Sequence, residues 1–345
     1  MIEYNNLLNG IIFAKTSNIT SLNLFLFIIL SLLLSLLIDM AFGELPTRIH
    51  PVVIIGSIID FFKKIFIGIK NKLSGLLTVL GVCIVSTVVL YVIYLISSLN
   101  IVLFTVVFIV LLSSTFSVNM LLQTATDVKN AFDMGIDRAR ELVSYLVSRN
   151  TDELTEAFIV SATIESLTEN ITDSYVAPVF YYFVFAGILL IHPIDNGLFY
   201  LLLVPMLYRI SNTQDAMLGY KSDELINIGF VPAKIDDILN FIPSRIAGIF
   251  MVISAYILNL DWKNAYKIMR RDARSCPSPN SGFTMATAAG ALNIQLIKKD
   301  TYILGDSNKD ITSDDISKAV SLSRFTIILF TITIILLFTL LYVIL

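Results

Sequence analysis

Residues 208–245 read YRISNTQDAMLGYKSDELINIGFVPAKIDDILNFIPSR and lie between two apolar runs. Charged and amide side chains are spaced irregularly in this stretch, and turn formers interrupt it at Gly219, Gly229, Pro232 and Pro243. That pattern indicates short helices broken by tight turns. A tether between two membrane helices needs no such mixture, so the stretch predicts a polar site at a membrane surface. The alternative is a solvated loop whose charges only keep it in water.

The composition around this stretch is typical of a polytopic membrane protein. The 345 residues are 56% hydrophobic and 15% charged, with a mean hydropathy of +0.81, whereas soluble domains carry about 25% charged residues. The net charge of −3 does not indicate a nucleic-acid partner. Cys83 lies in an apolar run and Cys276 in a polar loop, a placement that predicts neither a disulfide framework nor a metal site.

We expect an all-α fold, with residues 1–345 forming a single polytopic membrane domain. The domain would have helical cytoplasmic loops and a re-entrant or interfacial segment. About six runs are apolar and long enough to cross a bilayer at ~1.5 Å per residue. The predicted spans are about 22–42, 73–97, 99–122, 176–191, 197–210 and 325–345.

Two further apolar runs are expected not to cross. Residues 52–70 contain Asp60, Lys63 and Lys64, each of which would cost roughly 2.5–3.5 kcal/mol at the bilayer centre. This run therefore predicts an interfacial amphipathic helix. Ile246–Leu260 reaches only roughly 22 Å as a helix, which predicts a re-entrant or interfacial segment.

The distribution of Lys and Arg predicts the orientation in the cell membrane. These residues are dense in 43–72, 123–175, 211–245 and 261–324, and absent from 97–100 and 192–196. The positive-inside rule then places the functional loops 43–72, 123–175 and 211–324 in the cytoplasm, with both termini outside.

Three carboxylates between residues 157 and 178 form the first constellation with a chemical meaning. Glu165, Glu169 and Asp173 are spaced i, i+4, i+8 and share one face if the helix persists. Like charges are tolerated on such a face if it is solvated or binds a cation, and carboxylates with substrate phosphates are preferred Mg²⁺ ligands. We therefore expect a tentative Mg²⁺ site at these three acids; a solvated helix face is the alternative.

Two other stretches carry comparable groups. Asp215 and the adjacent Asp236 and Asp237 lie in the opening stretch, where dipole complementation at a helix N-terminus is the alternative explanation. In SPNSGFTMATAAGALN, residues 278–293, a Gly/Ser turn precedes an Ala-rich helix, a pattern that suits phosphate binding or ordinary capping. GxxxxGK[ST], HExxH and GxSxG motifs are absent, so neither a P-loop nor a hydrolytic triad is predicted.

The chain resembles the adenosylcobinamide-phosphate synthase family (CobD/CbiB) of cobalamin biosynthesis. Two departures are SRNT at 148–151 in place of a GRDT-like element, and Phe283 where the family usually has Trp. The tail after 297 is generic. The motifs that carry the resemblance are GELPTRIHPVVIIGSII (43–59), ARELVSYLVSRNT (139–151), IESLTENITDSYVAPVFYY (164–182), ISNTQDAMLGYKSDELINIGFVPAKIDDILNFIPSR (210–245) and SPNSGFTMATAAGALNIQL (278–296).

The resemblance implies an ATP-dependent amide ligation. A propionate of the corrinoid adenosylcobyric acid would be joined to (R)-1-amino-2-propanol or its O-phosphate, with ATP and Mg²⁺ taking part. By residue type, the expected catalytic groups are Glu165, Glu169, Asp173, Asp215, Asp236 and Asp237. The expected substrate- or phosphate-binding groups are His50, Asn170, Asn212, Lys221, Lys234, Arg245, Ser278, Asn280 and Gly282.

The opening stretch, the SPNSG turn and the 165–173 helix are expected to build one site over the cytoplasmic membrane face. Expected partners are the lipid bilayer, the two substrates and other cobalamin-biosynthesis enzymes. A non-enzymatic, AmpE-like membrane regulator is one alternative, although it need not keep these acids. A transporter is the other, but it would carry polar groups within its spans.

Overall fold

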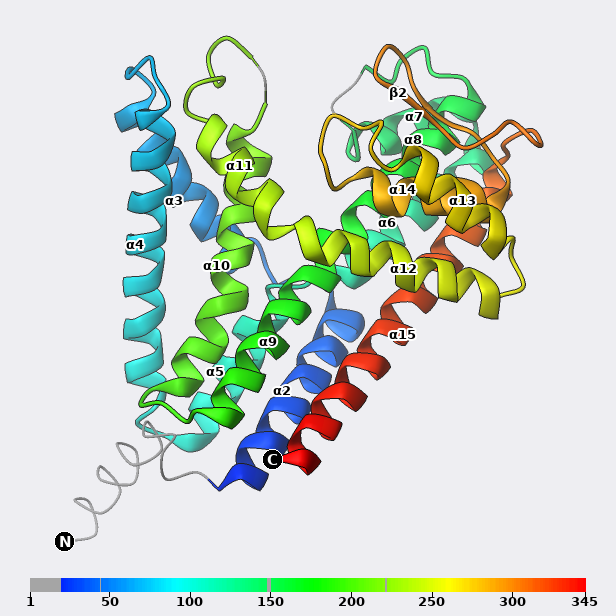
Figure 1. Ribbon diagram of the computed structural model, residues 1–345. Helices are drawn as coiled ribbons and strands as arrows, with labels where there is room; N and C mark the ends of the chain where they lie inside the picture. The colour runs from blue at the N-terminus through cyan, green and yellow to red at the C-terminus, as the bar shows by residue number, and fades with distance from the viewer. Residues whose placement is uncertain (1–19, 44, 148–149, 221) are drawn as a thin grey trace, which may run out of the picture. The chain divides into compact units, whose positions relative to one another are not determined.

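The computed structural model describes residues 20–345 except 44, 148–149 and 221. The chain divides into two compact units. Unit 1 comprises the described part of Met1–Ser117 with Pro178–Ile238 and Ile334–Leu345, and unit 2 comprises Val118–Ala177 and Leu239–Thr333. The described residues are mainly helical and contain very little sheet, as Figure 1 shows, which confirms the predicted all-α class. The single membrane domain stays a prediction.

Unit 1 is a helical assembly held by apolar packing and by buried hydroxyls. Its helices pack as α2 on α5, α3 on α4, and α10 on both α3 and α4. On α2, Ser35 Oγ donates to Ile109 O at 2.9 Å, and Tyr182 OH donates to Ile28 O at 3.0 Å. These bonds satisfy buried hydroxyls between apolar helices. Unit 1 contains α2 (Ser21–Phe42), α3 (Pro51–Phe66), α4 (Leu73–Ser97), α5 (Ile101–Ser113), α10 (Gly197–Leu218) and most of α9 (Ala177–Ile191) and α11 (Phe230–Leu239).

The helices suited to crossing a membrane agree in number with the prediction of about six. Five described helices pass by length and hydropathy, and a bent pair, Phe230–Leu239 with Phe241–Ile257, brings the number to six. The set differs from the predicted one, because α10 is not among them. The second half of α10 carries Arg209, Asn212 and Asp215, which lower its hydropathy. The expectation that 246–260 does not cross stays a prediction. The five are Ser21–Phe42, Leu73–Ser97, Ile101–Met134, Glu156–Ile191 and Ser313–Ile344.

Two helix boundaries differ from the predicted ones. Within the candidate span Ile101–Met134, which contains most of the predicted span 99–122, α5 ends at Ser113 and α6 (Val118–Ala131) begins after a turn. Ser114 Oγ and Thr115 Oγ1 donate to Leu111 O and Leu112 O at 2.7 Å each, so hydroxyls bond to carbonyls at this helix end. The predicted boundary near 175 is absent, because α8 (Glu156–Ile171) runs through the π-helical turn η3 (Thr172–Val176) into α9.

Unit 2 is built around α14 (Gly282–Leu292), the Ala-rich helix that the sequence predicted. All its residues except Phe283 are buried, and it packs on α8, α12 (Phe241–Ile257) and α13 (Trp262–Asp272), as Figure 1 shows. Small residues permit this close packing, since a Cβ on Gly290 would lie 2.7 Å from the Cα of Ala265 in α13. The rest of unit 2 includes η2 (Phe132–Met134), α7 (Ile136–Ser144) and most of α15 (Ser313–Ile344).

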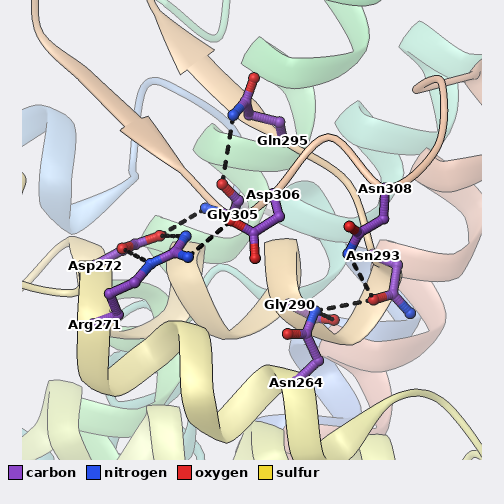
Figure 2. A network of polar contacts seen from close by, with 9 residues as sticks. All are labelled: Asn264, Arg271, Asp272, Gly290, Asn293, Gln295, Gly305, Asp306 and Asn308. Carbon is purple, nitrogen blue, oxygen red and sulfur yellow. Dashed lines mark hydrogen bonds and ion pairs between the residues drawn. The ribbon is translucent and has the colours of Figure 1, made fainter.

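A short antiparallel hairpin follows α14, in the segment that carried no family signal. Strand β1 (Leu296–Lys298) pairs with β2 (Tyr302–Leu304), with Leu296 opposite Leu304. The base of the hairpin is fixed to α13, because Asp272 Oδ2 accepts a hydrogen bond from Gly305 N at 2.8 Å (Figure 2). Although burial opposes its charge, the bonds from Arg271 and Gly305 hold the pKa of Asp272 below its usual value. The hairpin is thereby held in a defined position within unit 2.

Candidate functional site

The predicted site residues gather in separate groups within the two units. Unit 2 holds the acids of α8 and the SPNSG turn with Arg245, and unit 1 holds Asn212, Asp215, Lys234, Asp236 and Asp237. Lys221 lies outside the described residues. The expectation that all three stretches build one site stays a prediction.

Glu165 is buried and fully engaged by hydroxyl groups, so the solvated-face alternative is wrong for this residue. Only 4% of Glu165 is exposed. Ser161 Oγ donates to its Oε1 at 2.6 Å, and Tyr302 OH, from the hairpin, donates to its Oε2 at 2.9 Å. Ser161 Oγ in turn accepts from Ile297 N at 2.9 Å. This chain of bonds orients the carboxylate and joins α8 to the hairpin.

The Tyr302 hydroxyl is a donor at neutral pH. Burial raises its pKa above the usual value, and the neighbouring Glu165 carboxylate raises it further. The phenol therefore stays protonated and keeps its hydrogen bond to Glu165 across the physiological range. Tyr302 was not among the residues expected from the sequence, because 137 positions separate it from Glu165.

Tyr302→Phe is expected to lower kcat/KM of the reaction proposed below by about tenfold, because a hydrogen bond to a charged group contributes roughly 1.5 kcal/mol or more. The measurement is steady-state turnover, compared with the melting temperature of the same preparation. Tyr145→Phe, at an exposed tyrosine of the same unit, is the matched control. Unchanged turnover in Tyr302→Phe would show that this bond does not support the site.

The other two acids of this helix are placed differently. Glu169 is half-buried, accepts no hydrogen bond from a described residue, and lies within electrostatic range of Lys298 and Glu165. Asp173 lies on the π-helical turn, so the regular i, i+4, i+8 face does not continue to it. In the described part of the chain, no three His, Cys, Asp or Glu side chains are arranged to hold a metal ion. A Mg²⁺ ion at these acids therefore requires additional ligands from a substrate.

Asn170 is used within its own helix. Its Nδ2 donates to Ser166 O at 2.8 Å and to Ser166 Oγ at 3.4 Å. These bonds leave the Oδ1 atom of Asn170 as the group that would meet a substrate. The predicted binding role of Asn170 stays a prediction.

Arg245 and the SPNSG turn form the second group of unit 2. The Arg245 guanidinium lies between the rings of Phe241 and Phe283, with its Cζ 3.6 and 4.3 Å from their centroids. Its Nη1 donates to Asn280 Oδ1 at 2.9 Å, and Asn280 is itself buried. Arg245 makes no ion pair with any described residue, and Arg274 adds a second positive charge nearby. A held guanidinium without a carboxylate counterion suits a substrate phosphate or carboxylate.

The turn itself is shaped by packing as well as by hydrogen bonds. Ser278 Oγ accepts from Asn280 N at 3.3 Å. A Cβ at Gly282 would lie 2.2 Å from Ala273 O, so only glycine lets the start of α14 approach that carbonyl. The structure thus gives Gly282 a packing role, and its predicted contact with phosphate is untested.

The group in unit 1 joins α10 to α11. Residues 208–218 of the opening stretch form the end of the long helix α10 and not a short helix, whereas the ten-residue helix α11 fits the predicted pattern. Asn212 Nδ2 donates to Asp236 Oδ1 at 3.4 Å, and Lys234 Nζ pairs with Asp237 Oδ2 at 3.0 Å. The lysine side chain of the Lys234–Asp237 ion pair is exposed to solvent, so the pair adds little to the stability of the fold.

Asp215 is the perturbed acid of this group. Burial, together with the negative charges of Asp236 and Asp237, raises its pKa from 3.8 to about 7. A carboxyl group that titrates near neutrality can exchange a proton during catalysis. It also costs stability once it is charged, because the folded state then holds an unfavourable negative charge.

Asp215→Asn is therefore expected to stabilise the fold in a pH-dependent way. Between pH 3.8 and about 7 the folded state holds a proton that the unfolded state has lost, so wild-type stability falls as pH rises through this window. The melting temperature of Asp215→Asn should thus exceed that of the wild type by more at pH 8 than at pH 5. An equal difference at both pH values would contradict the assignment. Asp223→Asn, at an exposed acid of the same unit, is the control.

His50 caps a helix. It is 6% exposed, and its Nδ1 accepts from Val52 N at 3.2 Å at the start of α3. The helix that it caps is the amphipathic helix predicted over 52–70, although its interfacial position stays a prediction. The capping bond occupies Nδ1, and the predicted binding role of His50 stays a prediction.

Comparison with known proteins decides the family. The family model described as CobD/Cbib protein matches residues 32–323, which is most of the chain. The chain belongs to the CobD/CbiB family. A protein of Methanothermobacter thermautotrophicus named "Probable cobalamin biosynthesis protein CobD" is 44% identical over 87% of this chain and 94% of the relative. A Listeria monocytogenes protein named "Cobalamin biosynthesis protein CobD" is 33% identical over 84% of this chain and 91% of the relative. No solved structure matches the chain significantly.

Membership of the CobD/CbiB family places the protein in cobalamin biosynthesis and confirms the resemblance seen in the sequence motifs. The family match also covers the hairpin that holds Glu165. Burial raises the pKa of the Cys276 thiol to about 11, which keeps the thiol neutral and disfavours a role as a nucleophile.

Proposed function

We propose that the protein catalyses an ATP-dependent amide ligation in cobalamin biosynthesis. The carboxylate of adenosylcobyric acid attacks the γ-phosphorus of ATP, which gives an acyl phosphate and ADP. The amine of (R)-1-amino-2-propanol, or of its O-phosphate, then attacks the acyl carbon and expels inorganic phosphate. The amine loses one proton, and the product is adenosylcobinamide or its phosphate.

The observation that carries the proposal is Arg245. Both reacting partners are anions, and an activated carboxylate requires fixed positive groups beside the transferring phosphoryl group. Arg245 is stacked between two rings, held by Asn280, and without a carboxylate partner among the described residues. Nη1 also donates to Phe241 O at 2.6 Å and Nη2 to Pro279 O at 3.3 Å, so a phosphate would bind at the Nε–Nη2 edge, where no internal ion pair has to be broken first.

The acids supply the other half of the chemistry. Glu169, which has no hydrogen-bonded partner among the described residues, is the carboxylate that fits a Mg²⁺ ion shared with substrate phosphates. When bound, Mg²⁺ would neutralise charge on the transferring phosphoryl group. Glu165 is held in place by Ser161 and Tyr302 beside it.

The orientation in the cell membrane belongs to the same proposal, because ATP is cytoplasmic. We place 211–324 in the cytoplasm on the distribution of Lys and Arg. Asp310→Cys, at an exposed position of this segment and in a background with both native cysteines replaced by alanine, tests this orientation. The introduced thiol should resist a membrane-impermeant reagent in intact cells and react after permeabilisation. Labelling in intact cells would show that this segment lies outside the cell and would contradict the proposed orientation.

A direct assay tests the ligase. Purified protein is incubated with adenosylcobyric acid, aminopropanol O-phosphate and Mg-ATP, and the products are analysed by mass spectrometry. We expect the amide and an equal amount of ADP, with neither formed when ATP is omitted. Folded protein that forms no amide with either amine would favour the regulator. Uptake of a corrinoid into vesicles without amide formation would favour the transporter.

A further inference from the structure

Helix α13 presents a face that the fold of unit 2 does not use. Ala265, Ile268 and Met269 are buried on its inner face, where α13 packs on α14. The opposite face exposes aromatic and basic side chains in alternation. These are Trp262, Lys263, Tyr266, Lys267 and Arg270. Aromatic rings among the bases distinguish this face from an ordinary solvated helix surface.

The bases of this face form no ion pair within the described part of the chain. Figure 2 shows that Arg271 turns to the hairpin side, where it bonds Asp272 and, at 2.8 Å, Asp306. By contrast, Lys267 and Arg270 form no ion pair with any residue that the structure describes. The face is therefore positively charged, and an anionic partner would complement it.

The end of α12 gives this surface its second property. Ile249, Ile253 and Ile257 are 51%, 41% and 45% exposed along one side of α12, while its other side packs on α13 and α14. Tyr256 follows on the same side, and its ring meets that of Trp262 edge-on, with centroids 5.7 Å apart. Along the chain, the surface thus changes from apolar to aromatic to basic. That is the order of groups that a bilayer presents from hydrocarbon to headgroup.

We propose that the corner between α12 and α13 lies in the membrane interface, where Lys267 and Arg270 bind the phosphate groups of anionic phospholipids. Trp262 and Tyr266 then lie at the headgroup level, and the exposed isoleucines of α12 contact acyl chains. The ligand is a lipid and not a soluble phosphate, because the basic face continues into exposed isoleucines that a nucleotide would not cover. This contact does not depend on the proposed ligase activity.

The test uses Trp262, the only tryptophan in the chain. Full-length protein is placed in nanodiscs of phosphatidylcholine with a fixed minor fraction of phosphatidylglycerol. In one sample the phosphatidylglycerol carries bromine on its acyl chains. In the other sample the phosphatidylglycerol is unlabelled, and an equal amount of the phosphatidylcholine carries the bromine. We expect brominated phosphatidylglycerol to quench Trp262 at least about twofold more strongly, since each basic side chain near an anionic surface favours it several-fold. High salt should reduce the preference.

The variant Lys267→Gln/Arg270→Gln should lose this preference while Trp262 is still quenched by both lipids. The control Arg138→Gln/Lys299→Gln removes two exposed bases elsewhere in unit 2 and should keep the preference. Equal quenching by the two lipids in the wild type would overturn the proposal. So would an unchanged preference in Lys267→Gln/Arg270→Gln. Absence of quenching together with a fluorescence change on adding ATP would assign the face to a soluble anion instead.

Discussion

Replacement of Glu169 by glutamine is expected to lower kcat/KM for amide formation by about 100-fold, the size of effect seen when one electrostatic contact to a transition state is removed. Glutamine keeps the shape of the side chain but removes the charge that would hold a cation beside the phosphoryl group. Because the described structure offers no group of three ligands, each carboxylate that shares the ion with substrate matters strongly. Raising the Mg²⁺ concentration should recover part of the lost activity.

The measurement is turnover as a function of Mg²⁺, with the melting temperature as a check on folding. Glu156→Gln, at an exposed position at the start of the same helix, is the matched control and should retain normal activity. Near-normal turnover in Glu169→Gln would remove this residue from the site.

Arg245→Lys is the second substitution with a large expected effect, again about 100-fold in kcat/KM. Lysine keeps the positive charge but cannot stack between Phe241 and Phe283, and it cannot form two parallel hydrogen bonds to a phosphate. The loss should appear in kcat as well as in KM for ATP, because the group stabilises charge that moves during phosphoryl transfer.

Arg138→Lys controls for a general effect of replacing arginine, since Arg138 lies in an exposed ion pair with Glu141. Steady-state kinetics at saturating corrinoid separate the two parameters. If Arg245→Lys raised KM alone and left kcat unchanged, Arg245 would bind substrate without supporting the chemical step.

Residue types that are unusual for membrane loops marked the candidate site residues, whose roles stay predictions. Asn280 and Arg245 were both expected to bind anions, and the structure joins them by a hydrogen bond. The arrangement that orients Glu165 could not be predicted, because Tyr302 comes from a distant hairpin in a generic segment. Local spacing carries no information about such a contact.

The same reasoning explains the errors in the fold. Hydropathy favoured a boundary near 175, because Glu165 and Glu169 are charged and were assigned to a polar loop. Tertiary hydrogen bonds satisfy Glu165 inside the protein, so the helix continues from Glu156 through the π-helical turn to Ile191. Similarly, Asn212 and Asp215 lie on α10 and not in short broken helices. Charged residues indicate that a segment is not in contact with lipid, but they do not indicate that its helix ends there.

Transfer of oxygen from the substrate carboxylate to phosphate tests the central claim most directly. Adenosylcobyric acid labelled with ¹⁸O in the reacting carboxylate is converted with aminopropanol O-phosphate and Mg-ATP, and the products are analysed by mass spectrometry. The acyl phosphate route requires that one labelled oxygen remain in the amide and the other appear in inorganic phosphate. Formation of the amide with unlabelled inorganic phosphate, or with the label in AMP, would contradict this mechanism.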